Sequence, residues 1–212
     1  MNSFPSMQQP DGSLFCGAYC VVATLYSFDK LPFTAPLSLN RYDAQQKSFT
    51  GPKLDIVDSS NLVELALEFY KVTGILTPGP NPSYVDGAGN NSLGAMLSIL
   101  NQCDLKTEVV FKNEEALDQI RSVFPIEIEL IEKLGVPISL LDNNDSTPSD
   151  SVLISVIAYP ELHYVVNNHQ GEWFDSDLEA HLFHWDKIES WDESNNKREG
   201  ASWLGVSIRV RR

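Results

Sequence analysis

The chain has few cysteines, no long apolar run and a shortage of basic residues, and each shortage excludes a class of protein. Its 212 residues contain three cysteines, Cys16, Cys20 and Cys103, which is too few, and an odd number, for a disulfide framework. No apolar run approaches the roughly 20 residues of a membrane helix, and the first residues lack the basic and apolar regions of a secretory signal. We therefore expect a cytoplasmic protein without membrane insertion; export by a route independent of a signal peptide stays open.

The charge balance is strongly acidic, with 29 Asp and Glu against 15 Lys and Arg and a formal net charge of −14. Such a surface repels nucleic acid and anionic membranes, so we expect neither as a partner. Hydrophobic residues make up 42% and charged residues 21% of the chain, which is typical of a globular protein rather than a disordered one. The length suits one sizeable domain, which we assign to residues 1–212.

The order of the predicted elements divides this domain into a mainly helical part, 1–135, and a mainly β part, 136–212. Apolar periodicity and capping residues predict helices from Cys16 to about Phe28, from Ser59 or Ser60 to Gly74, and over 92–103, 114–124 and 125–134. Runs rich in Val, Ile and aromatic residues predict strands at 107–111, 136–141, 152–159, 163–168, 172–174 and 203–210. Residues 29–57 and 77–90 are predicted to be irregular. Helices followed by an antiparallel sheet indicate the α+β class.

Cys16 is the first residue of a predicted buried helix and is followed by Gly17. The dipole and the unpaired N–H groups of a helix N-terminus stabilise a thiolate, the reactive form of cysteine, and the glycine leaves space for a substrate. Further along the chain, His163 lies on a predicted strand and is followed by Asp175 and Asp177. A thiol, an imidazole and a carboxylate are the parts of a nucleophile–base–orienter triad. The plain alternative is that Cys16 is a small residue of the core.

The strongest resemblance to a known family surrounds this cysteine, in the segment Gln9-Pro10-Asp11-Gly12-Ser13-Leu14-Phe15-Cys16-Gly17-Ala18-Tyr19-Cys20. It resembles the nucleophile region of papain-superfamily cysteine peptidases, and among them it is similar to the josephin deubiquitinases. Bacteriocin-leader peptidases share the Gln…Cys-Gly opening and a Gly-x-Pro-Ile strand, here Gly135-Val136-Pro137-Ile138; SUMO-processing peptidases are also similar, but place His and Asp before the Cys.

This resemblance implies a papain-like fold, with the nucleophile helix of the N-terminal part packed on a C-terminal antiparallel sheet. It also implies that the side-chain amide of Gln9 helps to form an oxyanion hole. Gln9 stands seven residues before Cys16, a longer spacing than is usual in these families, so Gln8 stays as the alternative.

The partner of His163 is predicted from the hairpin that follows it. A three-residue loop, His169-Gln170-Gly171, pairs the flanking strands so that His163 lies opposite Asp177. A two-residue turn would shift the register and favour Asp175. The serine that follows Asp175 also suits an orienting residue in papain-like families, but the hairpin register leads us to favour Asp177 over Asp175.

The remaining candidate residues are expected to have structural roles or to lie in solvent. Cys20 is expected to pack in the core, and the cysteines with one distant histidine are too few to ligate zinc. The loop Asp142–Ser146 lacks the Gly and Glu of a calcium-binding EF-hand, so no metal or other cofactor is expected. His169, His181 and His184 are predicted to lie at the surface, the last two in a short helix that begins after Ser176.

The sequence thus predicts a thiol hydrolase that acts on an amide bond of a protein or peptide: a peptide bond, an isopeptide bond or a glutamine side chain. Cys16 attacks the carbonyl, His163 carries the proton, and Gln9 with the Cys16 backbone N–H binds the oxyanion. Two alternatives stay open. One is a catalytically silent binding protein on the same scaffold, and the other is a thiol-dependent acyltransferase or crosslinking enzyme.

Overall fold

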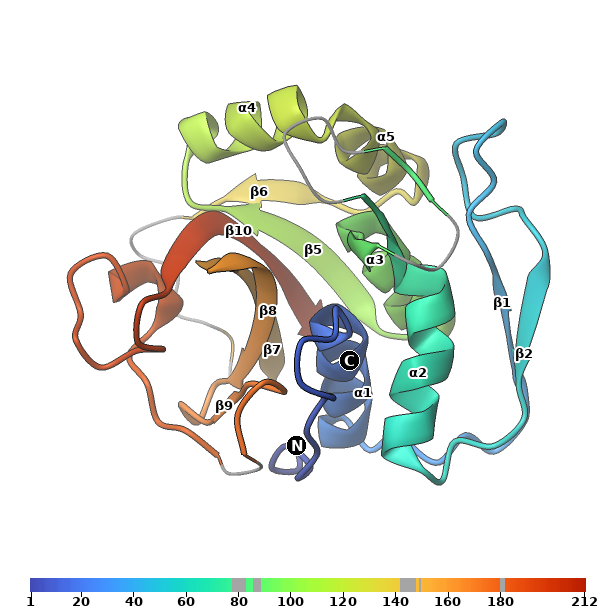
Figure 1. Cartoon of the computed structure of the whole chain (residues 1–212), viewed down its shortest axis with the longest axis horizontal. Coiled ribbons are helices and arrows are strands. Elements are labelled where there is room, and N and C mark those ends of the chain that lie inside the picture. The colour runs from blue at the N-terminus through green and yellow to red at the C-terminus, as the bar shows by residue number, and fades with distance from the viewer. Residues whose placement is uncertain (78–82, 86–88, 142–147, 149, 180–181) are drawn as a thin grey trace.

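Helices from the N-terminal part of the chain cover one face of a six-stranded, mostly antiparallel sheet, as the computed structural model shows (Figure 1). The structure describes all residues except 78–82, 86–88, 142–147, 149 and 180–181. The predicted loop Asp142–Ser146, His181 and parts of the predicted loop 77–90 therefore lie outside the described residues. The arrangement is α+β, as predicted.

The described helices are α1 (Cys16–Ser27), α2 (Leu62–Thr73), α3 (Leu93–Gln102), α4 (Glu114–Val123), α5 (Pro125–Lys133) and the 3-10 helix η1 (Ile188–Ser190). The described strands are β1 (Leu37–Asn40), β2 (Lys53–Ile56), β3 (Gly74–Leu76), β4 (Asn90–Asn91), β5 (Lys106–Phe111), β6 (Ile138–Leu140), β7 (Ser151–Tyr159), β8 (Glu161–Asn168), β9 (Trp173–Phe174) and β10 (Ser202–Arg211). The predicted helices in the first 135 residues and the predicted strands are present, most with ends shifted by a residue or two.

The main sheet has the strand order β6-β5-β10-β7-β8-β9. Only β5 and β6 pair in parallel; the other neighbours are antiparallel. The strand β10, which follows all the others in the chain, lies between β5 and β7 and so joins the two sides of the sheet. Residues that alternate along β7 point to opposite faces, as in any strand, and both faces are covered.

The larger core lies between the helices and one face of the sheet. The helix α1 is buried along its whole length except at Tyr26 and packs against β8 and α2 (Figure 1). Its sequence is apolar or small on nearly every side, which suits a helix surrounded by protein. The opposite face of the sheet is covered by the chain between β9 and β10, through a cluster that includes Trp173, Trp191 and Trp203.

Three local expectations were wrong. Residues 29–57 contain the β1–β2 hairpin, in which Leu39 and Ile56 are buried. The N-cap of α2 is Asn61, whose side chain accepts from the first-turn N–H groups. The hydroxyl of Ser59 accepts a hydrogen bond from Phe33 N at 2.7 Å, and that of Ser60 donates to Asp58. The described residues after Ser176 form a turn rather than a helix.

In the part of the chain that the structure describes, no helix combines the length and the apolar character needed to cross a membrane.

Candidate active site

Cys16 is the first residue of α1, and its side chain is buried near the protein surface, with 5% exposed. The residue before it, Phe15, is the N-cap but makes no hydrogen bond from its side chain to the helix. The first turn therefore has N–H groups without a local acceptor. The positive end of the helix dipole lies at this turn, beside the thiol. The predicted position of this cysteine is confirmed.

The missing cap of α1 is supplied by Asn91, a residue of β4 that the sequence analysis did not single out. Its Oδ1 accepts hydrogen bonds from Ala18 N at 3.2 Å and from Thr73 Oγ1 at 2.6 Å. Its Nδ2 donates to Leu14 O at 2.7 Å and lies 3.8 Å from the sulfur of Cys16. Asn91 thus fixes both the loop before α1 and the first turn of the helix. No sequence signal indicated it, because the contact spans more than 70 residues.

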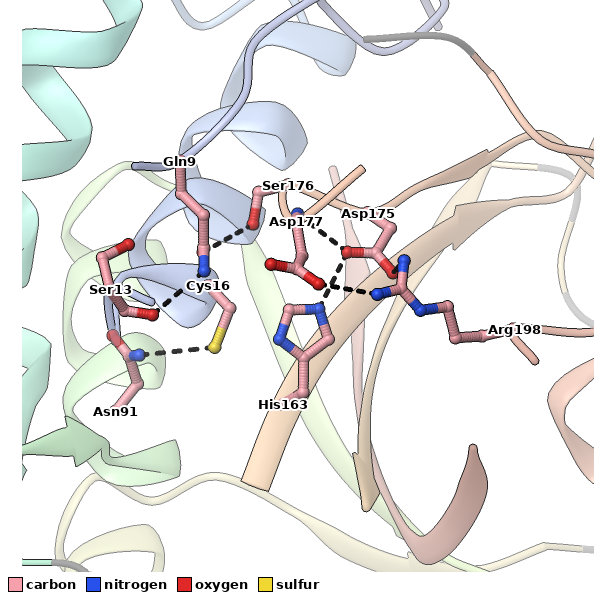
Figure 2. Close-up of polar contacts among 9 residues, drawn as sticks. All are labelled: Gln9, Ser13, Cys16, Asn91, His163, Asp175, Ser176, Asp177 and Arg198. Carbon is pink, nitrogen blue, oxygen red and sulfur yellow. Dashed lines mark hydrogen bonds and ion pairs between the residues drawn. The ribbon is translucent and has the colours of Figure 1, made fainter. Parts of the chain in front are cut away.

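His163 is buried on β8 and lies between Cys16 and a carboxylate (Figure 2). Its Nε2 lies 2.8 Å from Oδ1 of Asp175, which leaves Nδ1 for the thiol. Burial acts to lower the pKa of His163, but the hydrogen bonds to Asp175 and Cys16 and their charges outweigh it and raise the pKa to about 10. The arrangement therefore favours an imidazolium at neutral pH.

The carboxylate beside His163 belongs to Asp175, so the preference for Asp177 was wrong. The hairpin has the predicted register, with Val166 paired to Phe174, and Gly171 has the left-handed φ of +79° that its loop requires. However, β9 ends at Phe174, and the chain turns away before Asp177 can face His163. The backbone N–H of Asp177 instead donates to Asp175 Oδ1 at 3.0 Å.

Arg198 is the second residue that the sequence analysis missed. Its side chain is buried, and its Nη2 donates to Asp177 Oδ2 at 2.6 Å. Its Nη1 lies 3.1 Å from Asp175 Oδ2 as an ion pair, without the alignment of a hydrogen bond. The guanidinium also lies over the ring of Tyr159, 4.2 Å from its centroid. A cation thus stands on the side of Asp175 away from His163 (Figure 2).

Gln9 lies beside Cys16, whereas the side chain of its alternative, Gln8, is exposed. The backbone N–H of Gln9 donates to Ser176 O at 2.8 Å, and its Oε1 accepts from Ser176 Oγ at 2.9 Å. Its Nε2 donates to Ser13 O at 3.1 Å and points toward Cys16 (Figure 2). Because an amide nitrogen carries two hydrogens, one of them is available to a group bound at the thiol.

Cys20 lies one turn after Cys16 and is fully buried, as expected of a core residue. Burial, together with the nearby Cys16 and Asp175, raises the pKa of the Cys20 thiol well above its ordinary value, so it stays protonated. Among the residues that the structure describes, no group of three or more His, Cys, Asp or Glu side chains is placed to hold a metal ion.

An apolar cavity of about 40 Å³ opens next to the strand that carries His163. The residues on either side of the histidine, Leu162 and Tyr164, line it together with Leu76 and Leu93. The hydroxyl of Tyr164 donates to the backbone oxygen of Asn91 at 2.9 Å, which ties the cavity wall to the residue that caps α1.

No protein-family model matches this chain, and no match is found among curated proteins or solved structures. The chemistry of the site is therefore argued from its own atoms.

Proposed function

We propose that the chain is a papain-like thiol hydrolase that acts on amide bonds of proteins or peptides. The observation that carries the proposal is that Cys16, at the N-terminus of a buried helix, faces His163, which is hydrogen-bonded at 2.8 Å to the buried Asp175. These groups come from three separate segments of the chain, and general acid–base chemistry requires this order of thiol, imidazole and carboxylate.

Before the proposed reaction begins, His163 Nδ1 already holds the proton of Cys16, so the resting pair is a thiolate and an imidazolium. The thiolate attacks the substrate carbonyl carbon, and the oxygen that becomes negative is held by Gln9 Nε2 and the Cys16 backbone N–H. The imidazolium then protonates the leaving amine, the C–N bond breaks, and a thioester remains on Cys16. Water, deprotonated by His163, hydrolyses the thioester and restores the thiol.

Three substrate classes use the same steps: a peptide bond, an isopeptide bond, and the side-chain amide of glutamine, whose leaving group is ammonia. A transferase would differ only in the last step, where an amine replaces water.

The test is the pH dependence of Cys16 alkylation by iodoacetamide, followed by mass spectrometry in the wild type and in His163→Ala. An unactivated thiol has a pKa near 8.5, so only about one part in 300 is thiolate at pH 6. We expect wild-type Cys16 to react about 100-fold faster than glutathione at pH 6, and the substitution to remove this advantage. Cys103, also buried, is the internal control in each digest.

Alkylation of Cys16 at the glutathione rate, or no alkylation at all, would overturn the proposal and leave a catalytically silent binding protein. If the thiol is activated, peptide libraries incubated with and without an added amine separate hydrolysis from acyl transfer. Release of ammonia from glutamine-containing peptides identifies deamidation.

A further inference from the structure

Arg198 belongs to the segment between β9 and β10, which is not part of the sheet, and its side chain extends from there to the candidate site. The chain between β9 and β10 crosses the face of the sheet opposite α1 and is anchored there by tryptophans. The rings of Trp173 and Trp191 lie 5.0 Å apart between centroids, Trp191 Nε1 donates to Asp186 O at 2.9 Å, and Lys197 Nζ donates to Trp191 O. These contacts hold the backbone that leads to Arg198 against the sheet.

The two carboxylate oxygens of Asp175 face different cations. Oδ1 accepts from His163 Nε2 at 2.8 Å, while Oδ2 lies 3.1 Å from Arg198 Nη1. Because the second contact lacks hydrogen-bond alignment, Arg198 influences Asp175 mainly through its positive charge and does not orient the carboxylate by a hydrogen bond. Its aligned hydrogen bond goes to Asp177, at 2.6 Å, and this holds the guanidinium in place.

The charged and titratable groups around this cluster come from several elements. Cys16 and Cys20 face it from α1, as the electrostatic influence of Cys16 on His163 and of Asp175 on Cys20 indicates. Tyr159, near the end of β7, stacks under Arg198. Asp175 and Asp177 follow β9. Arg198 is thus the one cation beside Asp175 among the described residues when His163 is neutral.

We propose that Arg198 is a positioning residue that shares the charge of Asp175 and thereby limits how tightly His163 holds its proton. The inference rests on the proposed function and extends it. A buried carboxylate without a second cation would be balanced by the imidazolium alone, and the imidazolium would then be too stable to protonate a leaving amine efficiently. By sharing the charge of Asp175, Arg198 preserves the ion pair with Cys16 while leaving the proton transferable.

The test is an NMR titration of His163 in protein labelled with 15N-histidine, in a Cys16→Ala background. Removing the thiol takes away one of the groups that stabilise the imidazolium and brings the titration to lower pH. We expect Arg198→Met to move the midpoint of His163 upward by about one pH unit. Arg198→Gln, which keeps a hydrogen-bond donor but removes the charge, should give the same shift, whereas Arg198→Lys should restore most of the original midpoint.

A midpoint that does not move, or moves downward, in Arg198→Gln or Arg198→Met would overturn the role of Arg198. If Arg198→Met does not fold, the His163 titration in Arg198→Gln decides the question, provided that its amide NMR spectrum is that of a folded protein. The parallel measurement is Cys16 alkylation at pH 6 in Arg198→Gln with the thiol present, expected within about threefold of wild type because the ion pair persists. Failure of wild-type alkylation would contradict the proposed function instead, so the two failures are distinguishable.

Discussion

The two nitrogens of His163 have different partners, and the difference assigns them different chemical tasks. Nε2 is occupied by Asp175 at 2.8 Å, so the ring orientation is fixed by a group that does not react. Nδ1 is left for Cys16 and, in the proposed reaction, carries the proton that moves. On the other side of the sulfur stands Nδ2 of Asn91, 3.8 Å away. The thiol therefore lies between an imidazole and an amide donor.

The choice between the two aspartates is testable at this scale. Asp175→Ala removes the residue that orients His163, and we expect the rate of Cys16 alkylation at pH 6 to fall by at least about tenfold. Asp177→Ala removes a carboxylate that contacts Arg198 but not His163, and it should change the rate by less than about threefold. Equal losses in the two variants, or the reverse order, would contradict the assignment to Asp175.

The raised pKa of His163 also has a consequence for stability. Because its folded-state pKa, about 10, lies above the ordinary value of 6.5, the charged ring stabilises the fold fully below pH 6.5. This contribution, on the order of a few kcal/mol, is lost as the pH rises from 6.5 toward 10. We expect the free energy of unfolding, measured with urea, to fall over this range in the wild type.

His163→Gln is the control, because other groups also titrate in this range. The difference in unfolding free energy between wild type and variant should shrink steadily from pH 6.5 to pH 10. A difference that stays constant, or grows, would show that His163 is not held as an imidazolium.

At the scale of single elements, helix α1 depends on residues distant from it in the sequence. Its apolar sequence forms the helix and buries it, but Phe15 leaves the first turn uncapped. Asn91 of β4 completes that turn and also anchors Leu14, the residue two places before Cys16. By contrast, α2 is capped locally, because Asn61 Oδ1 accepts from Val63 N and Glu64 N.

These two asparagines form a matched pair for mutation. Asn91→Ala leaves buried N–H and C=O groups without partners, and we expect a loss of about 2–4 kcal/mol of unfolding free energy. Asn61→Ala leaves the first N–H groups of α2 to hydrogen-bond with water, and we expect a loss of about 1 kcal/mol of unfolding free energy. Urea denaturation measures both. Cys16 alkylation at pH 6 should slow in Asn91→Ala and stay unchanged in Asn61→Ala; slowing in both would mean that general destabilisation, rather than the local contact, controls the thiol.

The same contrast explains what the sequence could predict. The position of Cys16 at a helix start, the strand that carries His163 and the hairpin register with its left-handed Gly171 all follow from local patterns. The end of β9 at Phe174 does not follow from local patterns, because it depends on tertiary contacts of the next residues with Gln9 and Arg198. The sequence contained both Asp175 and Asp177, but only the tertiary contacts decide which of them faces His163. Asn91 and Arg198 carried no local signal at all.

At the scale of the whole molecule, the excess of acidic over basic residues gives the chain a large net negative charge. The net charge of −14 produces repulsion that a folded chain concentrates into a smaller volume than an unfolded one. The ion pairs at the surface, such as Lys71 with Glu68, are exposed and offset little of it.

Salt should therefore stabilise this protein at neutral pH. Raising NaCl from about 10 mM to about 150 mM shortens the screening length from about 30 Å to about 8 Å, and we expect the unfolding temperature to rise by a few degrees. Calorimetry in NaCl and in NaNO3 at equal ionic strength separates screening from effects of the particular anion. A fall in the unfolding temperature in both salts would mean that attractive ion pairs outweigh the repulsion.

The position of β10 in the middle of the sheet has a consequence for biosynthesis. Residues 202–211 lie between β5 and β7, yet the ribosome makes them after every other strand of that sheet. Until they emerge, β5 with β6 and β7 with β8 have no strand to join them, and long-range pairing of this kind is slow to form. The helix α1 packs directly against β8, so the contact between Cys16 and His163 joins elements that are both made before β10. A chain that stops before Ser202 would therefore hold its main sheet as two separate pieces, β6 with β5 and β7 with β8 and β9.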